Sequence, residues 1–111
     1  MRILVVEATA GLYQPIGARI AVVKRLRELG HVVQEADNSD VAAALMLSHN
    51  PQVVVLQSGQ PQVALREFAS RLKGINPDIP IVVLGPCEPG ENLDAQVGDI
   101  TELEALLKTM D

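Results

Sequence analysis

Short apolar runs alternate with helix-like segments along most of the chain. Runs rich in Val, Ile and Leu cover residues 2–7, 31–36, 52–57 and 79–85, and their length and β-branched content are typical of buried strands. Apolar positions recur with helical spacing over residues 15–30, 40–48, 61–75 and 102–110. Strands that alternate with helices indicate a parallel sheet covered by helices on both faces.

Residues at the ends of these segments support the assignment. Pro15 suits the first turn of the first helix, and Gly30 suits the position just past its end. Thr101 and Glu104 have the spacing of a capping box for the last helix. Since right-handed crossovers leave few topologies, we expect a flavodoxin-like order in which the first strand lies beside the second and third.

The pattern weakens between residues 85 and 99, which contain two prolines and three glycines. A fourth helix would be a single turn there, and a fifth strand would be no longer than residues 95–98. We therefore expect a single α/β domain over residues 1–111, with a parallel sheet of four or five strands and a reduced fourth-helix region. Its core should include Val54, Val82 and Leu84.

Composition narrows the classes of function. The chain is 48% hydrophobic and carries a net charge of −5, which argues against binding to nucleic acid or to an anionic membrane. Lys24, Arg25 and Arg27 are interpreted as the solvated face of one helix. A single cysteine, Cys87, suits a reducing compartment, and no apolar run is long enough to span a bilayer, so we expect a cytoplasmic protein.

Five segments resemble, in order, those of a response-regulator receiver domain: MRILVVE, ELGHVVQEADN, NPQVVVLQSGQP, NPDIPIVVLG and DITELEALL. The resemblance covers most of the chain, except residues 8–15 and 86–96. In receivers an acidic pair ends the first strand and holds Mg²⁺, and an aspartate at the end of the third strand accepts a phosphoryl group. A Ser or Thr ends the fourth strand, and a Lys ends the fifth.

This chain departs from the receiver pattern at most of these positions. The acidic pair falls on Glu7 and Ala8, the aspartate on Gln57, the hydroxyl on Gly85 and the lysine on Gln96. An amide is not a nucleophile for phosphoryl transfer, and one carboxylate is a poor ligand set for Mg²⁺. The resemblance therefore implies a degenerate phosphorylation site with no catalytic residue and no metal. It implies a pseudo-receiver that acts in signalling through protein–protein contacts, without a cofactor.

A second resemblance leaves an alternative open. GLYQPIGARIAVVKRLRELGH and NPDIPIVVLGP are similar to the cobalamin-binding domain that precedes radical-SAM enzymes, although the Asp-x-His-x-x-Gly ligand motif is absent. A small ligand would meet Thr9, Gly11, Gln57 and Ser58 at the rim of the sheet. The other interpretation of these residues is that they satisfy local backbone groups at a former site.

An enzyme that uses Glu7 or Cys87 is the third class. A nucleophilic cysteine needs a base beside it, and the expected fold places no histidine near Cys87. His31 and His49 do not form a metal-binding spacing with it. We therefore expect that the chain is not an enzyme.

The far edge of the sheet, beyond the fourth strand, is expected to be thinly covered by residues 85–99. Exposed edges tend to pair with another chain. We expect self-association or partner binding through the fourth strand, the loop of residues 86–98 and the final helix, with Leu93, Val97, Leu103 and Met110 as apolar contacts. The alternative is that the loop folds back and seals the edge.

Overall fold

The computed structural model describes residues 1–6, 16–36, 39–57, 62–85 and 93–110, with side chains except at 16–20, 39, 57 and 62–65. Strands and helices alternate along it, as the sequence predicts. The elements are β1 (Arg2–Val6), α1 (Ile16–Glu28), β2 (Val32–Ala36), α2 (Ser39–Ser48), β3 (Val53–Gln57), α3 (Gln62–Ile75), β4 (Ile81–Leu84), β5 (Ala95–Val97) and α4 (Ile100–Met110).

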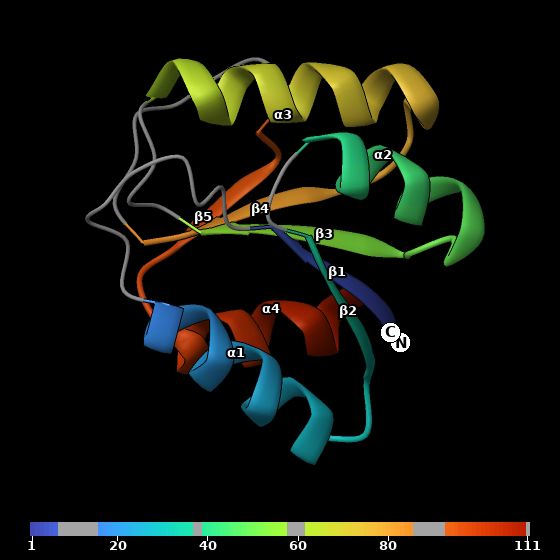
Figure 1. Ribbon diagram of the computed structural model, residues 1–111. Helices are drawn as coiled ribbons and strands as arrows, with labels where there is room; N and C mark the ends of the chain where they lie inside the picture. The colour runs from blue at the N-terminus through green and yellow to red at the C-terminus, as the bar shows by residue number, and fades with distance from the viewer. Residues whose placement is uncertain (7–15, 37–38, 58–61, 86–92, 111) are drawn as a thin grey trace.

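The strands form one sheet in the order β2-β1-β3-β4-β5, and every pairing between neighbours is parallel. β1 lies between β2 and β3, so the predicted flavodoxin-like order is confirmed. Figure 1 shows α2 and α3 over one face of the sheet and α1 and α4 over the other. This arrangement leaves β2 and β5 as the two edge strands.

Alternation along the strands divides the core into two layers. Leu4, Val54 and Val83 pack with α2 and α3, whereas Ile3 and Val82 pack with α1 and α4. Successive side chains of a strand point to opposite faces, so strands covered on both sides must be apolar at every position. The predicted core positions are confirmed, since Val54 and Val82 are fully buried and Leu84 is nearly so.

The short strand β5 and helix α4 close one edge of the sheet. α4 begins at Ile100, and Asp99 caps it, because the Glu102 backbone N–H donates to Asp99 Oδ1 over 2.9 Å. The Glu102 carboxylate in turn accepts from the N–H of Gly98, one residue before the cap. This arrangement resembles a capping box two residues earlier than the one predicted at Thr101. Aspartate at residue 99 was an equally good cap by residue type, and the pattern alone did not choose between them.

The apolar contacts expected at this edge need correction. Leu103 is fully buried and Val97 is 7% exposed, and both belong to the core layer beneath α1 and α4. Leu93 and Met110 are partly buried and pack against the two core layers. Leu103 and Val97 are therefore structural residues of the domain. The periodicity of α4 could not reveal which surface Leu103 would meet, and the short strand β5 gave no pattern that placed Val97.

Both described ends of the chain lie at the amino-terminal side of the sheet. β1 starts there, and α4 runs back to that side after β5, so the labels N and C fall together in Figure 1. The carboxyl ends of the strands gather at the opposite side, which we call the rim. Within the described residues, none of the helices is long and apolar enough to cross a membrane.

Candidate functional site

The rim brings together the residues that follow the parallel strands. In the register of the sheet, Gln57 at the end of β3 is paired with Leu84 at the end of β4, and Leu84 is paired with Val97 of β5. Gly85 follows directly. The positions that the receiver resemblance assigns to the aspartate and to the hydroxyl therefore lie on neighbouring strands, as they must for a shared site.

Gly85 is held by β5. Its N–H donates to the carbonyl oxygen of Val97 over 2.7 Å, and its own carbonyl oxygen accepts from Nε2 of Gln96 over 2.6 Å. The residue is buried and has a φ of 107°. Residues with a Cβ rarely adopt this backbone conformation, so glycine suits this corner and a serine or threonine would be strained there.

Gln96 occupies the position to which the resemblance assigns the lysine. Its side-chain amide donates to Gly85 O and, at 3.3 Å, to Val97 O. The amide thus satisfies two backbone carbonyl groups at the end of the sheet. The lysine of a receiver carries a positive charge. The Gln96 amide is neutral, and its hydrogen bonds are made to backbone carbonyl groups.

Several predicted site residues lie outside the described residues. These are Glu7, Ala8, Thr9, Gly11 and Ser58, together with Cys87, and the side chain of Gln57 is also not described. The rim is therefore defined by backbone register and by Gly85 and Gln96. Within the ranges described, no group of three His, Cys, Asp or Glu side chains is arranged to hold a metal ion.

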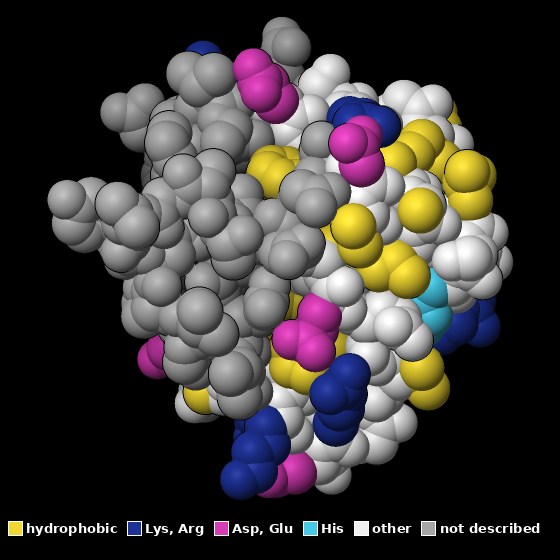
Figure 2. Space-filling model, viewed as in Figure 1, with side chains coloured by type: hydrophobic (Ala, Val, Ile, Leu, Met, Phe, Trp, Pro, Cys, Tyr) yellow, Lys and Arg dark blue, Asp and Glu magenta, His cyan; other side chains and the backbone are white. Residues whose placement is uncertain are grey.

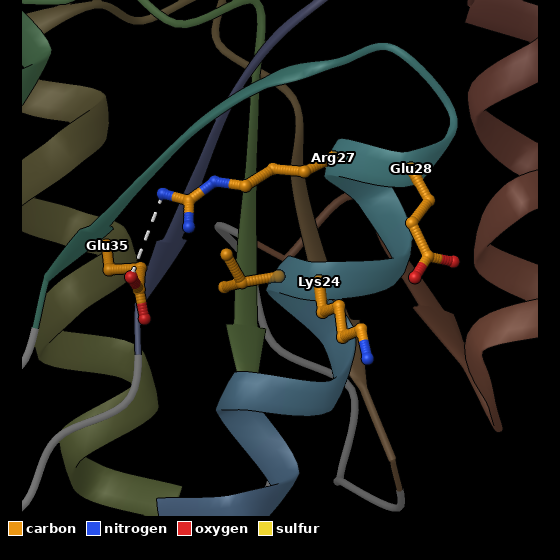
Figure 3. Close-up of a pocket in the computed structure, with 5 residues that line it drawn as sticks. Lys24, Arg27, Glu28 and Glu35 are labelled. Carbon is orange, nitrogen blue, oxygen red and sulfur yellow. Dashed lines mark ion pairs between the residues drawn. The ribbon is translucent and has the colours of Figure 1, made fainter.

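A separate hollow of about 440 Å³ lies beside the other edge of the sheet, between α1 and β2. Val23, Lys24, Arg27, Glu28 and Glu35 line it, and Figure 3 shows Arg27 reaching from α1 toward Glu35 on β2. The guanidinium Nη2 of Arg27 donates to Val33 O over 2.9 Å and lies 3.8 Å from Glu35 Oε2.

The neighbouring Arg25 connects two helices. Its Nε donates to Glu104 Oε1 of α4 over 2.6 Å, and this hydrogen bond raises the pKa of Arg25. The interpretation of the basic cluster as a solvated face is therefore incomplete, because Arg25 and Arg27 are about half exposed but both have acidic partners on other elements. Sequence spacing gave no signal of these partners, which the fold brings close.

A further residue that sequence reasoning missed is Asp94, just before β5. Its Oδ2 accepts from the Ile81 backbone N–H over 2.7 Å and from Lys73 Nζ over 2.8 Å. The backbone N–H of Asp94 donates to Ile81 O. Asp94 therefore fastens the start of β4 to the edge strand and to α3.

Comparison with known proteins identifies the fold. No protein-family model matches the chain, and no curated protein matches it. A cobalamin-binding protein from Desulfitobacterium hafniense DCB-2 superposes with a TM-score of 0.81 at 15% identity, covering 99% of this chain. This chain spans only 58% of the length of that protein.

Response regulators superpose over nearly their full length. The response regulator TrrA from Thermotoga maritima, in complex with Mg²⁺-BeF, gives a TM-score of 0.76 at 23% identity over 99% of this chain and 98% of that one. In complex with the histidine kinase ThkA, TrrA gives 0.77 at 23% identity over 98% and 97%. Together with the sheet order and the rim, these superpositions show that the chain has the fold of response-regulator receiver domains.

Proposed function

We propose that the chain is a pseudo-receiver, which is not switched by aspartyl phosphorylation and which acts through contacts with other proteins. The observation that carries this proposal is the residue at the end of β3, Gln57. The receiver resemblance places the phospho-accepting aspartate at this position. A neutral amide lacks the nucleophilic oxygen that phosphoryl transfer to a side chain requires.

The corner beside β3 supports the proposal. The position of the receiver hydroxyl is Gly85, whose positive φ is unfavourable for any residue that could carry a hydroxyl. The position of the lysine is Gln96, whose amide is bonded to backbone carbonyl groups. Ala8 replaces one of the two acidic residues that bind Mg²⁺ in receivers. The chain therefore departs from the receiver pattern at the phospho-acceptor, at the metal-binding acidic pair, and at the hydroxyl and lysine positions.

Contact with other proteins is the mode of action that we propose for a domain without phosphorylation. TrrA, which shares the fold, has been solved in complex with a histidine kinase. A domain of this fold with an inert rim would transmit information by binding, with its partner chosen by surface shape and charge.

The test is treatment with acetyl phosphate and Mg²⁺, followed by intact-mass spectrometry. We expect no added phosphate, whereas a receiver domain that retains its aspartate, treated in parallel, gains the adduct. A phosphate adduct on this chain that maps to the end of β3 would overturn the proposal.

A second candidate function is binding of a cobalamin, which the superposition on the Desulfitobacterium hafniense protein favours. The sequence from the first loop into α1, with Pro15 and Gly17 two residues apart, is similar to that of such domains. Incubation with hydroxocobalamin followed by gel filtration tests it. Co-elution of the chromophore with a changed absorption spectrum would support this candidate, and elution of the colour with the small molecules would remove it.

A further inference from the structure

Helix α2 has an apolar outer face. Asp40, which pairs with Arg71 at 2.8 Å, is its single charged residue. Val41 and Leu47 are 39% and 75% exposed. A surface helix normally presents charged residues to water, and Figure 2 shows hydrophobic side chains gathered over the region of α2. This surface is typical of one that is covered by another molecule.

The edge strand β2 lies next to this helix. The Val32 N–H donates to Met1 O, so Val32, Gln34 and Ala36 direct their backbone groups toward β1. Because backbone groups alternate along a strand, those of Val33 and Glu35 point away from the sheet. The side chain of Arg27 on Val33 O agrees with this direction.

We propose that two copies of this chain associate through β2, which pairs with β2 of the second copy in antiparallel fashion around Gln34. The pairing places Val33 opposite Glu35 of the second copy, and Glu35 opposite Val33. These are the residues whose backbone groups point outward, so the hydrogen bonds can form on both sides of the axis. The two sheets then form one continuous sheet.

Charge complementarity favours a second copy over a foreign strand. In this register Glu35 of one copy lies opposite Val33 of the other, and the Arg27 guanidinium already lies at Val33 O. Arg27 can therefore leave this carbonyl oxygen to the partner strand and pair with Glu35 of the second copy. The hollow of Figure 3 carries Lys24 and Arg27 as well as Glu28 and Glu35. In the dimer this hollow faces the same hollow of the second copy, so the basic side chains of one copy lie opposite the acidic side chains of the other.

The helices fit the same arrangement. α2 contacts both β1 and β2, so two copies of α2 on the continuous sheet lie about two strand spacings apart, or about 10 Å. Packed helices are separated by about 8–10 Å. The two α2 helices would cover each other's apolar surface, and small Ala44 on that exposed surface permits close approach. Val32 and Leu47 would lose their exposure to water.

A mixing experiment tests the charge pairing between copies. Arg27→Glu and Glu35→Arg are prepared separately, and association is measured by sedimentation across a broad range of concentration. Each variant alone puts like charges across the axis, so its dimer Kd should rise by more than roughly tenfold relative to wild type. The mixture restores opposite charges only between copies and should dimerise as wild type does. A mixture no more associated than its components, or a wild type that stays monomeric, would overturn the proposal.

A cysteine scan tests the register independently of charge. In a Cys87→Ser background, Gln34→Cys places two sulfurs opposite each other at a non-hydrogen-bonded pair, where the Cα atoms are close enough for a disulfide. The matched control is Val32→Cys, whose two copies would lie about 13 Å apart, too far to bridge. Mild oxidation should cross-link the first variant and not the second. Equal cross-linking of both, or of neither, contradicts this register.

The proposal is independent of the chemistry at the rim. It rests on residues of β2, α1 and α2 in this chain, and it does not depend on which function the rim has. Treatment with acetyl phosphate reports on Gln57, whereas sedimentation and cross-linking report on β2, so failure of one proposal is distinguishable from failure of the other.

Discussion

The side-chain amide of Gln96 donates a hydrogen bond of 2.6 Å to the backbone carbonyl of Gly85. These two residues hold the positions at which the receiver resemblance expects a lysine and a hydroxyl. In this chain they stabilise the end of β4 against β5. The corner that would hold a phosphoryl group in a receiver is here occupied by a contact between neutral groups.

The backbone of Gly85 provides a first prediction. Gly85→Ser should lower the free energy of unfolding by about 1–3 kcal/mol, since a residue with a Cβ is strained at positive φ. Denaturant unfolding followed by circular dichroism measures the change. The matched control is Gly74→Ser in α3, where an added Cβ meets nothing within 4 Å. An unchanged stability of Gly85→Ser would show that this corner tolerates a hydroxyl.

The central strands provide a second prediction. Val54→Ala or Val82→Ala should cost about 1–3 kcal/mol of unfolding free energy, because each removes buried methyl groups and leaves a cavity. Leu29→Ala is the control, since Leu29 is 42% exposed just past the end of α1. Equal effects at Val54 and Leu29, measured by denaturant unfolding, would contradict the burial assigned to β3.

Asp94 provides a third prediction. Asp94→Ala leaves the Ile81 N–H and the Lys73 ammonium without their acceptor, which should cost about 1–3 kcal/mol. Asp94→Asn retains an acceptor oxygen for Ile81 and should lose less. Hydrogen exchange at the Ile81 amide gives a local measurement, with faster exchange expected in the alanine variant than in the asparagine variant. The same rate in both variants would remove Asp94 as the clamp of β4.

The contact between Arg25 and Glu104 provides a fourth prediction. Arg25→Ala and Glu104→Ala should each destabilise the packing of α1 against α4, and the double variant should lose less than the sum of both. The coupling should weaken as salt is added, because the pair is partly exposed. Thermal unfolding at low and high ionic strength measures it. Strict additivity of the two substitutions would mean that the contact contributes nothing.

Much of the fold followed from local pattern. The sequence of β-branched runs and helical stripes predicted the strand order, and even the weak stretch 95–98 forms a strand, although a short one. The features that the sequence pattern did not predict are those that depend on which surfaces pack against each other. The stripe that contains Leu103 has the same periodicity whether it faces a core or a partner, and only the packed structure shows that it faces the core.

The candidate site also combines features that local sequence predicts with features that depend on tertiary packing. The positions of Gln57 and Gly85 at the rim can be read from the sequence, because each lies at the end of an apolar run. The contact from Arg27 to Val33 joins residues on different elements, and its geometry depends on how α1 lies beside β2. Charges that lie close together in sequence show only that a helix is polar, and they give no information about the backbone groups that their side chains reach.

The common position of the two chain ends has a practical consequence. Because Met1 and the end of α4 lie on the side of the sheet opposite the rim, a tether at either end would hold the domain with its rim facing outward. Immobilisation through a terminal tag would leave the rim, where Gln96 is exposed, accessible to a soluble protein or a small molecule. Either end of the chain is therefore a suitable attachment point for surface-based binding assays.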